Sequence, residues 1–144
     1  AEEIGRLPAF LFRDLETVWI HRGNENYGGG NKNLLIHTGR TPEYVADGVL
    51  GEVFIHEAAH TSMDSYHAAD RHWIAAQEAD QMAISQYALE HPGREDIAES
   101  LGPYLGYRFR PDRLRPKRLK EVEETIPNRV LFLDCLTLSM DILQ

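Results

Sequence analysis

The sequence predicts an α+β domain in which a small strand-rich part precedes a larger helical part. Two short runs of β-branched and apolar residues, 18–21 and 34–38, lie in the first third of the chain. From Val45 onward, apolar residues recur at helical spacing, and prolines or glycines separate the periodic segments. We therefore expect a small antiparallel sheet or hairpin within about residues 1–44, packed on a helix, followed by helices over about 45–144.

The size and composition of the chain are typical of a single globular domain. It has 144 residues, of which 42% are hydrophobic and 26% are charged. Its longest apolar run is shorter than a membrane-spanning helix requires. The net charge of −8 disfavours a nucleic-acid partner, because binding nucleic acid requires a broad basic face. We expect a soluble protein with neither a membrane span nor a nucleic-acid partner.

The start of the chain and its cysteine content say little about the compartment. The first residues are acidic and precede no apolar stretch of the kind that a signal peptide contains. The chain does not begin with Met, as expected of a processed or secreted fragment. Cys135 is the single cysteine, which excludes an intrachain disulfide and a thiolate-based zinc site. It lies in an apolar helical stretch, where we expect a buried and inert thiol.

The remaining elements follow from the same patterns, taken in chain order. Residues 24–33 are dense in glycine and asparagine and predict a flexible hairpin connection; they lack the helix start and lysine of a phosphate loop. Helical periodicity and breakers predict helices over about 47–60 with Asp47 as N-cap, over 69–90, over 95–107, and over 119–143 with a break at Pro127.

A basic cluster precedes the last helical region. It borders three glutamates, so we interpret it as a solvated helix start with intrahelical ion pairs. The alternative is a contact with phosphate or with an acidic substrate. The cluster consists of Arg108, Arg110, Arg113, Arg115, Lys117, Arg118 and Lys120.

The most informative stretch is His56-Glu57-Ala58-Ala59-His60. Residues four apart lie on the same face of a helix, so both imidazoles can bind one metal ion. Glu57 lies beside them, where its carboxylate can act as the base for a water on that ion. The stretch therefore predicts one Zn²⁺ ion held by His56 and His60, with Glu57 as a catalytic residue.

The residues around this motif favour a functional site over a chance match. An apolar stripe that includes Val49, Val53 and Phe54 runs into the motif without a proline. Three ionisable side chains in such an apolar segment would be costly to bury unless they shared a metal ion. The alternative is that two histidines simply lie on a helix surface.

Catalytic zinc sites usually have three protein ligands, so the motif lacks one. Glu95 and Glu99 are the best-placed carboxylates, because they lie four apart on one predicted helix face after a proline–glycine turn. One can bind the metal while the other accepts the ring N–H of a ligand histidine; an exposed acidic first turn is the alternative. Asp64 is a second candidate for orienting a ligand histidine, and His67 is another candidate ligand. Glu78 and Asp80 are also candidates, but they lie in mid-helix, where a charge is usually solvated.

Together these residues resemble the gluzincin metallopeptidases, especially the group similar to anthrax lethal factor. The resemblance covers roughly residues 50–105 and rests on the histidine motif and on Glu95-Asp96-Ile97-Ala98-Glu99. It implies a zincin-like fold, with Glu95 as the third zinc ligand. It also implies that Tyr87 polarises the scissile carbonyl, although its spacing from Glu95 is one residue longer than in the family. Residues 33–38 would be the edge strand that binds extended substrate.

The function expected from these residues is zinc-dependent hydrolysis of peptide bonds in a peptide or protein substrate. Glu57 would take a proton from the metal-activated water and pass it to the leaving amine, and Tyr87 would stabilise the oxyanion. Two alternatives remain open. One is a zinc-binding regulatory or interaction module with little or no turnover, and the other is a metal-free helical scaffold.

Overall fold

The computed structural model describes residues 2–141 and shows an α+β protein that divides into two compact units. The first unit comprises the chain up to Met63 together with its end from Leu138, and the second comprises Asp64–Thr137. Each unit has buried apolar residues of its own. The predicted α+β class, with strands in the first third of the chain, is confirmed.

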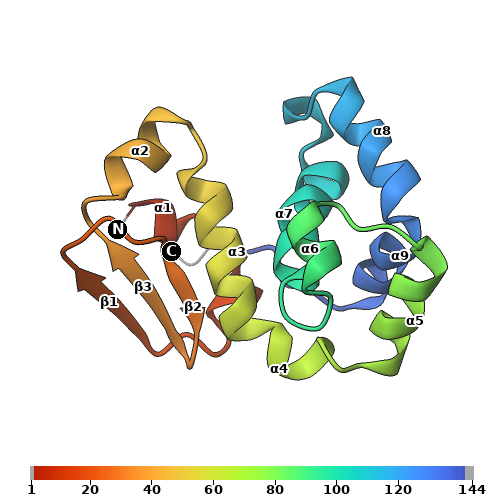
Figure 1. Ribbon diagram of the computed structural model, residues 1–144, viewed down its shortest axis with the longest axis horizontal. Helices are drawn as coiled ribbons and strands as arrows, with labels where there is room; N and C mark the ends of the chain where they lie inside the picture. Colours follow the sequence, from red (N-terminus) through yellow and green to blue (C-terminus); the bar gives the residue numbers. More distant parts are fainter. Residues whose placement is uncertain (1, 142–144) are drawn as a thin grey trace. The chain divides into compact units, whose positions relative to one another are not determined.

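The first unit contains a small sheet and the helix that carries the histidine motif. In Figure 1 the sheet lies in the red to orange part of the chain, and α3 runs beside it. The elements are α1 (Glu2–Gly5), the 3-10 helix η1 (Ala9–Phe12), β1 (Thr17–His21), β2 (Gly28–Gly30), β3 (Asn33–His37), α2 (Thr41–Ala46) and α3 (Leu50–Ser62).

The strand order in this sheet is β1–β3–β2, so β3 is the central strand. β2 pairs with β3 in antiparallel orientation, whereas β1 pairs with β3 in parallel. The prediction of an antiparallel sheet is therefore wrong for β1. The prediction that residues 33–38 form the substrate-binding edge strand is also wrong, because β2 forms where a loop was expected and pairs with the remaining side of β3.

β2 lies inside the stretch that was expected to be a flexible connection. Asn31 and Lys32 follow it with positive φ angles of 46° and 62°, which are typical of a two-residue type I′ turn. The turn brings Gly30 opposite Asn33. Glycine is depleted in strands, so three glycines in succession do not predict one. Pairing with β3 overrides that weak local preference.

α3 packs closely on β2 because β2 consists of glycines. A Cβ atom built on Gly29 would lie 1.8 Å from the carbonyl oxygen of Glu57, so a larger residue does not fit here. The Thr61 hydroxyl accepts a hydrogen bond from the Gly30 N–H at 2.8 Å. It also lies 2.9 Å from the carbonyl oxygen of Asn33, to which it donates. One threonine thus links α3 to both sides of the turn.

The start of α3 differs from the sequence prediction. Val49 is the N-cap of α3, and Asp47 ends α2 instead of capping α3. Gly48, with a positive φ of 72°, separates the two helices. The predicted N-cap is therefore wrong, because a separate short helix occupies the residues that were assigned to the approach of α3.

Gly29→Ala is expected to destabilise the first unit, whereas Gly28→Ala is expected to have a small effect. The methyl group at position 29 must displace main chain of α3, at a cost of at least about 2 kcal/mol. At Gly28 the methyl group would meet Leu35 at 3.6 Å, an ordinary packing distance. Urea denaturation followed by circular dichroism measures both variants. Equal unfolding midpoints would contradict the close packing of α3 on β2.

The second unit is helical. Helices predicted over residues 95–107 and on both sides of Pro127 are present. The last of them is shorter than the predicted end at 143, because it stops at Cys135 and residues 136–141 are not helical; 142 and 143 lie outside the described residues. No helix formed by residues 2–141 is long and apolar enough to cross a membrane. The elements are α4 (Asp64–His67), α5 (Arg71–Asp80), α6 (Gln86–Glu90), α7 (Asp96–Phe109), the 3-10 helix η2 (Pro111–Arg113), α8 (Pro116–Thr125) and α9 (Pro127–Cys135).

The single long helix predicted over residues 69–90 is wrong, since α5 and α6 are separate. α5 ends at Asp80, and its C-cap residue Gln81 has a left-handed φ of 57°. The carbonyl oxygen of the next residue, Met82, accepts a hydrogen bond from Arg129 Nη1 at 2.8 Å. Ser85 is then the N-cap of α6, and its side chain accepts a hydrogen bond from the Ala88 N–H. A contact from α9 and a new N-cap therefore replace the continuous helix.

A buried ion-pair network joins α5, α7 and α9 at their ends. Arg129 is 3% exposed, and it lies 2.9 Å from Asp80 and 2.7 Å from Asp96. The Asn128 backbone N–H also donates to Asp80 at 2.8 Å, and Gln77 donates to Asp96 at 2.7 Å. The expectation of a solvated Asp80 is therefore wrong. Its carboxylate is buried because Arg129 balances the charge and hydrogen bonds satisfy its oxygens.

Cys135 was expected to be buried, but it is exposed. It is the last residue of α9, whose buried residues are Arg129, Val130 and Leu133. Those three share one face of the helix, and Cys135 lies outside it. The helix is apolar enough to suggest burial all round, but only one side of it is covered.

Candidate metal centre

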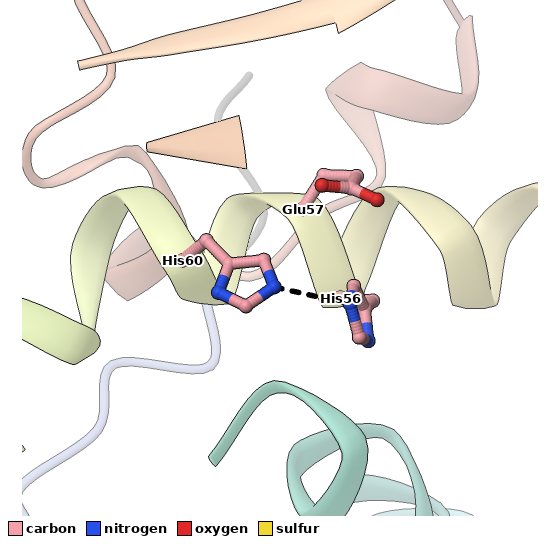
Figure 2. Close-up of side chains that lie close together, drawn as sticks. All are labelled: His56, Glu57 and His60. Carbon is pink, nitrogen blue, oxygen red and sulfur yellow. Dashed lines mark hydrogen bonds between the residues drawn. The ribbon is translucent and has the colours of Figure 1, made fainter. Parts of the chain in front are cut away.

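α3 places His56 and His60 one helical turn apart, with both imidazoles on the same side of the helix, as Figure 2 shows. Their Nε2 atoms are 3.1 Å apart and their ring centroids are 4.8 Å apart. One ligand atom from each of His56, Glu57 and His60 lies within 4.8 Å of the others. The structure thus brings these three predicted side chains together.

The geometry of this group suits a divalent metal ion. Two nitrogens bound tetrahedrally to one zinc ion at 2.0–2.1 Å lie about 3.3 Å apart, close to the observed separation of 3.1 Å. All three side chains are half-buried, so solvent can reach them. The group can therefore hold a metal ion. Imidazole also suits copper, iron and nickel, so these donors do not select zinc by themselves.

Packing in the first unit holds the backbone that presents this group. Phe54 and Ala58 of α3 are buried, and the main chain at Glu57 lies against β2. At the end of the helix, the Ser62 hydroxyl donates to the carbonyl oxygen of Leu11 at 2.8 Å. The candidate ligands therefore project from a helix that is anchored along its length, which favours a defined geometry.

Tyr87 and Glu95 form a second group, in the second unit. The Tyr87 hydroxyl donates to Glu95 Oε1 at 3.0 Å, and Arg94 Nε lies 3.0 Å from the same oxygen. Glu95 is 2% exposed and Tyr87 is 45% exposed. The hydrogen bond to Glu95 raises the pKa of Tyr87 above its ordinary value. At neutral pH the Tyr87 hydroxyl is therefore protonated and can donate a hydrogen bond.

The backbone beside Glu95 is fixed by residues that sequence reasoning missed. Glu95 is the N-cap residue of α7 and is followed by the fully buried Asp96. Asp96 is held by Arg129 and Gln77 as described above. The one sequence signal for this network was an arginine at position 129, beside the apolar residues of the last helix. It could not show which carboxylates the arginine meets.

The other predicted residues lie on α4, α5 and α7. Glu99 lies in the first turn of α7, and its backbone N–H donates to the Glu95 carbonyl at 2.9 Å. Asp64 and His67 are the first and last residues of α4, and the His67 ring meets Phe132 at 5.8 Å between centroids. Glu78 is exposed on α5.

The predicted site residues thus form two groups, one in each unit. His56, Glu57 and His60 belong to the first, and Tyr87 and Glu95 belong to the second. Each unit is defined by its own internal contacts, so the role of Glu95 as third ligand stays a prediction from the sequence.

Comparisons with models of protein families, with curated proteins and with solved structures found no match to this chain. The resemblance to gluzincins therefore stays an expectation that rests on the motif residues. Function has to be judged from the chemistry that these side chains can perform.

Proposed function

We propose that this protein is a zinc-dependent metallopeptidase in which Glu57 is the general base. The main support is the 3.1 Å separation of the His56 and His60 Nε2 atoms, with a carboxylate oxygen of Glu57 within 4.8 Å of the group. Two imidazoles that share an ion and a carboxylate beside them are the core of a site that hydrolyses with water.

Each residue would have a separate task. A bound Zn²⁺ would supply Lewis acidity and a water whose pKa is close to neutral. His56 and His60 would hold the ion through Nε2. Glu57 would take a proton on its carboxylate and pass it to the nitrogen of the leaving amine. The single O–H of Tyr87, which donates to Glu95 in the structure, would turn to the substrate carbonyl oxygen as negative charge develops on it.

Glu95 would be the third ligand, as the resemblance to gluzincins implies. Its side chain is almost fully buried and is oriented by Tyr87 and Arg94, which both contact Oε1. The network at Asp96 restrains the adjoining backbone. A carboxylate held in this way is already ordered, so it loses little conformational freedom when it binds an ion. This favours a ligand role.

Removal of the metal tests the proposal. Purified protein is expected to contain about one equivalent of zinc by elemental analysis and to cleave a quenched fluorescent peptide library. A chelator should abolish cleavage, and added Zn²⁺ should restore it, because the water is too weak a nucleophile without the ion.

Glu95→Gln should weaken zinc binding by more than about 100-fold, beyond the effect typical of residues that only orient a ligand. Glu90→Gln, an exposed residue of α6, is the control.

Each other outcome has a definite meaning. Cleavage that resists the chelator would contradict a metal-dependent mechanism. One equivalent of zinc without cleavage of any peptide would contradict the peptidase proposal and leave a zinc-binding interaction module. Unchanged zinc affinity in Glu95→Gln would show that another group completes the ligand set.

A further inference from the structure

We propose that the basic segment, residues 108–120, binds short acidic stretches of other proteins. This segment contains seven of the fifteen Lys and Arg residues of the chain but only one of its 23 Asp and Glu residues. It therefore carries a charge of +6, although the whole chain carries −8. A cationic segment on a strongly acidic protein creates a local field that attracts anions.

The cations of the basic segment divide into paired and unpaired ones. Arg113, Arg115 and Lys117, which we call the basic patch, are exposed and form no ion pair with any of residues 2–141. The nearby acidic side chains have partners already. The pairs are Arg108 with Asp134, Arg110 with Asp112, Arg118 with Glu121, and Lys120 with Glu124, and the Tyr107 hydroxyl donates to Glu123.

This division agrees with the sequence interpretation and adds to it. Intrahelical pairs do form in α8, at Arg118 and Lys120, as expected for a solvated helix start. Arg113 and Arg115 lie before that helix. Glu121 lies four residues after Lys117, but it pairs with Arg118 instead. The charge of the basic patch is therefore available to a partner.

The backbone that carries the basic patch is anchored. Leu114 packs against α7, since a Cβ atom built on Gly106 would lie 3.0 Å from Leu114 Cδ1. Leu114 and Arg115 are extended, with ψ angles of 141° and 145°. Side chains alternate in an extended backbone, so Arg113 and Arg115 are directed away from the anchored Leu114. A partner thus meets cations that are already placed, which lowers the entropic cost of binding.

A short acidic peptide fits this patch better than a long polyanion does. Alternate residues of an extended peptide are about 6.6 Å apart, which is also the spacing expected between Arg113 and Arg115 on either side of the extended Leu114. Two carboxylates of such a peptide can meet the two arginines, and a third can meet Lys117. A nucleic acid or an anionic membrane would extend well beyond one Debye length, about 8 Å, and would be repelled by the acidic remainder of the chain.

The inference rests on the proposed function only for the identity of the partner, because the acidic stretch would then belong to the substrate. Binding itself requires no metal ion. It is therefore measured on metal-free protein, separately from cleavage.

The test compares two triple variants of the full chain that lose the same charge. The patch variant combines Arg113→Gln, Arg115→Gln and Lys117→Gln. The control variant combines Arg6→Gln, Arg22→Gln and Lys32→Gln, three exposed cations of the first unit. Fluorescence anisotropy measures binding of a labelled octaglutamate peptide and of a labelled single-stranded oligonucleotide of eight residues. Co-sedimentation measures binding to phosphatidylserine vesicles. Circular dichroism verifies that each variant is folded.

We expect the unmodified chain to bind octaglutamate at low salt and to release it at about 1 M salt. The patch variant should bind at least about tenfold more weakly, since each exposed ion pair contributes modestly. The control variant should stay within about twofold. Absence of binding, equal weakening in both variants, or tighter binding of the oligonucleotide or the vesicles would overturn the proposal.

Cleavage then separates the two proposals. A peptide that binds the patch but is never cleaved would reject the peptidase function and leave the binding surface standing. A peptide cleaved equally well with and without an acidic stretch would support the peptidase function and reject substrate selection by the patch.

Discussion

Glu57→Gln is expected to abolish peptide cleavage while the protein still binds zinc. Glutamine has nearly the shape of glutamate, so α3 and the two histidines should keep their geometry. The amide cannot accept the proton that the carboxylate takes from water, and loss of a general base typically costs about 10²–10⁴-fold in rate. The measurement pairs the cleavage rate of a fluorescent peptide with the zinc content of the same sample.

Glu52→Gln provides the matched control for this prediction. Glu52 is an exposed residue in the first turn of the same helix, so the substitution changes the charge of α3 equally but leaves the histidine group intact. Its cleavage rate should remain within about twofold of the unmodified protein. Retained turnover in zinc-loaded Glu57→Gln would remove Glu57 from the mechanism. Loss of zinc from that variant would instead make Glu57 a ligand.

Arg129→Met is expected to destabilise the second unit by about 3–5 kcal/mol. Methionine can fill much of the space, but Asp80 and Asp96 would then be buried without a positive partner. Unfolding in urea is followed through Trp73, which is fully buried in this unit. A Trp19→Phe background removes the other tryptophan, which lies on β1 in the first unit.

Arg108→Met provides the comparison, because Arg108 pairs with Asp134 where both side chains are part-exposed. Solvent screens that pair, so its loss should cost about 0–1 kcal/mol. Adding Asp80→Asn and Asp96→Asn to Arg129→Met should recover part of the stability, since it removes the uncompensated charges. Equal losses for Arg129→Met and Arg108→Met would show that the buried pairs contribute no more than a surface pair.

The histidine group could be predicted because its members are close in sequence. His56, Glu57 and His60 lie within five residues, so the helical repeat alone sets the imidazoles on one face. The apolar residues around them were enough to predict that helix, although not its first residue. The structure adds the 3.1 Å separation of the nitrogens, which local periodicity cannot specify.

The contacts of Glu95 and of the neighbouring ion-pair network could be predicted only in part. Tyr87 is eight residues away, and the resemblance to gluzincins pointed to it. Arg129 and Asp96 are 33 residues apart, and Arg129 and Asp80 are 49 residues apart. An isolated arginine in a sequence has many possible carboxylate partners, and only the packing of α5, α7 and α9 selects two of them.

The sequence alone determined the features that depend on neighbours within one or two helical turns. These are the α+β class, the helix of the histidine motif, the helix after Glu95 and the break at Pro127. Tertiary structure decided the features in which distant segments compete with local preference. Pairing with β3 turned three glycines into a strand, close contact required Gly29 beside α3, and Arg129 stabilised the end of α5. Local propensities differ by about 1 kcal/mol or less per residue, so the tertiary contacts described here readily override them.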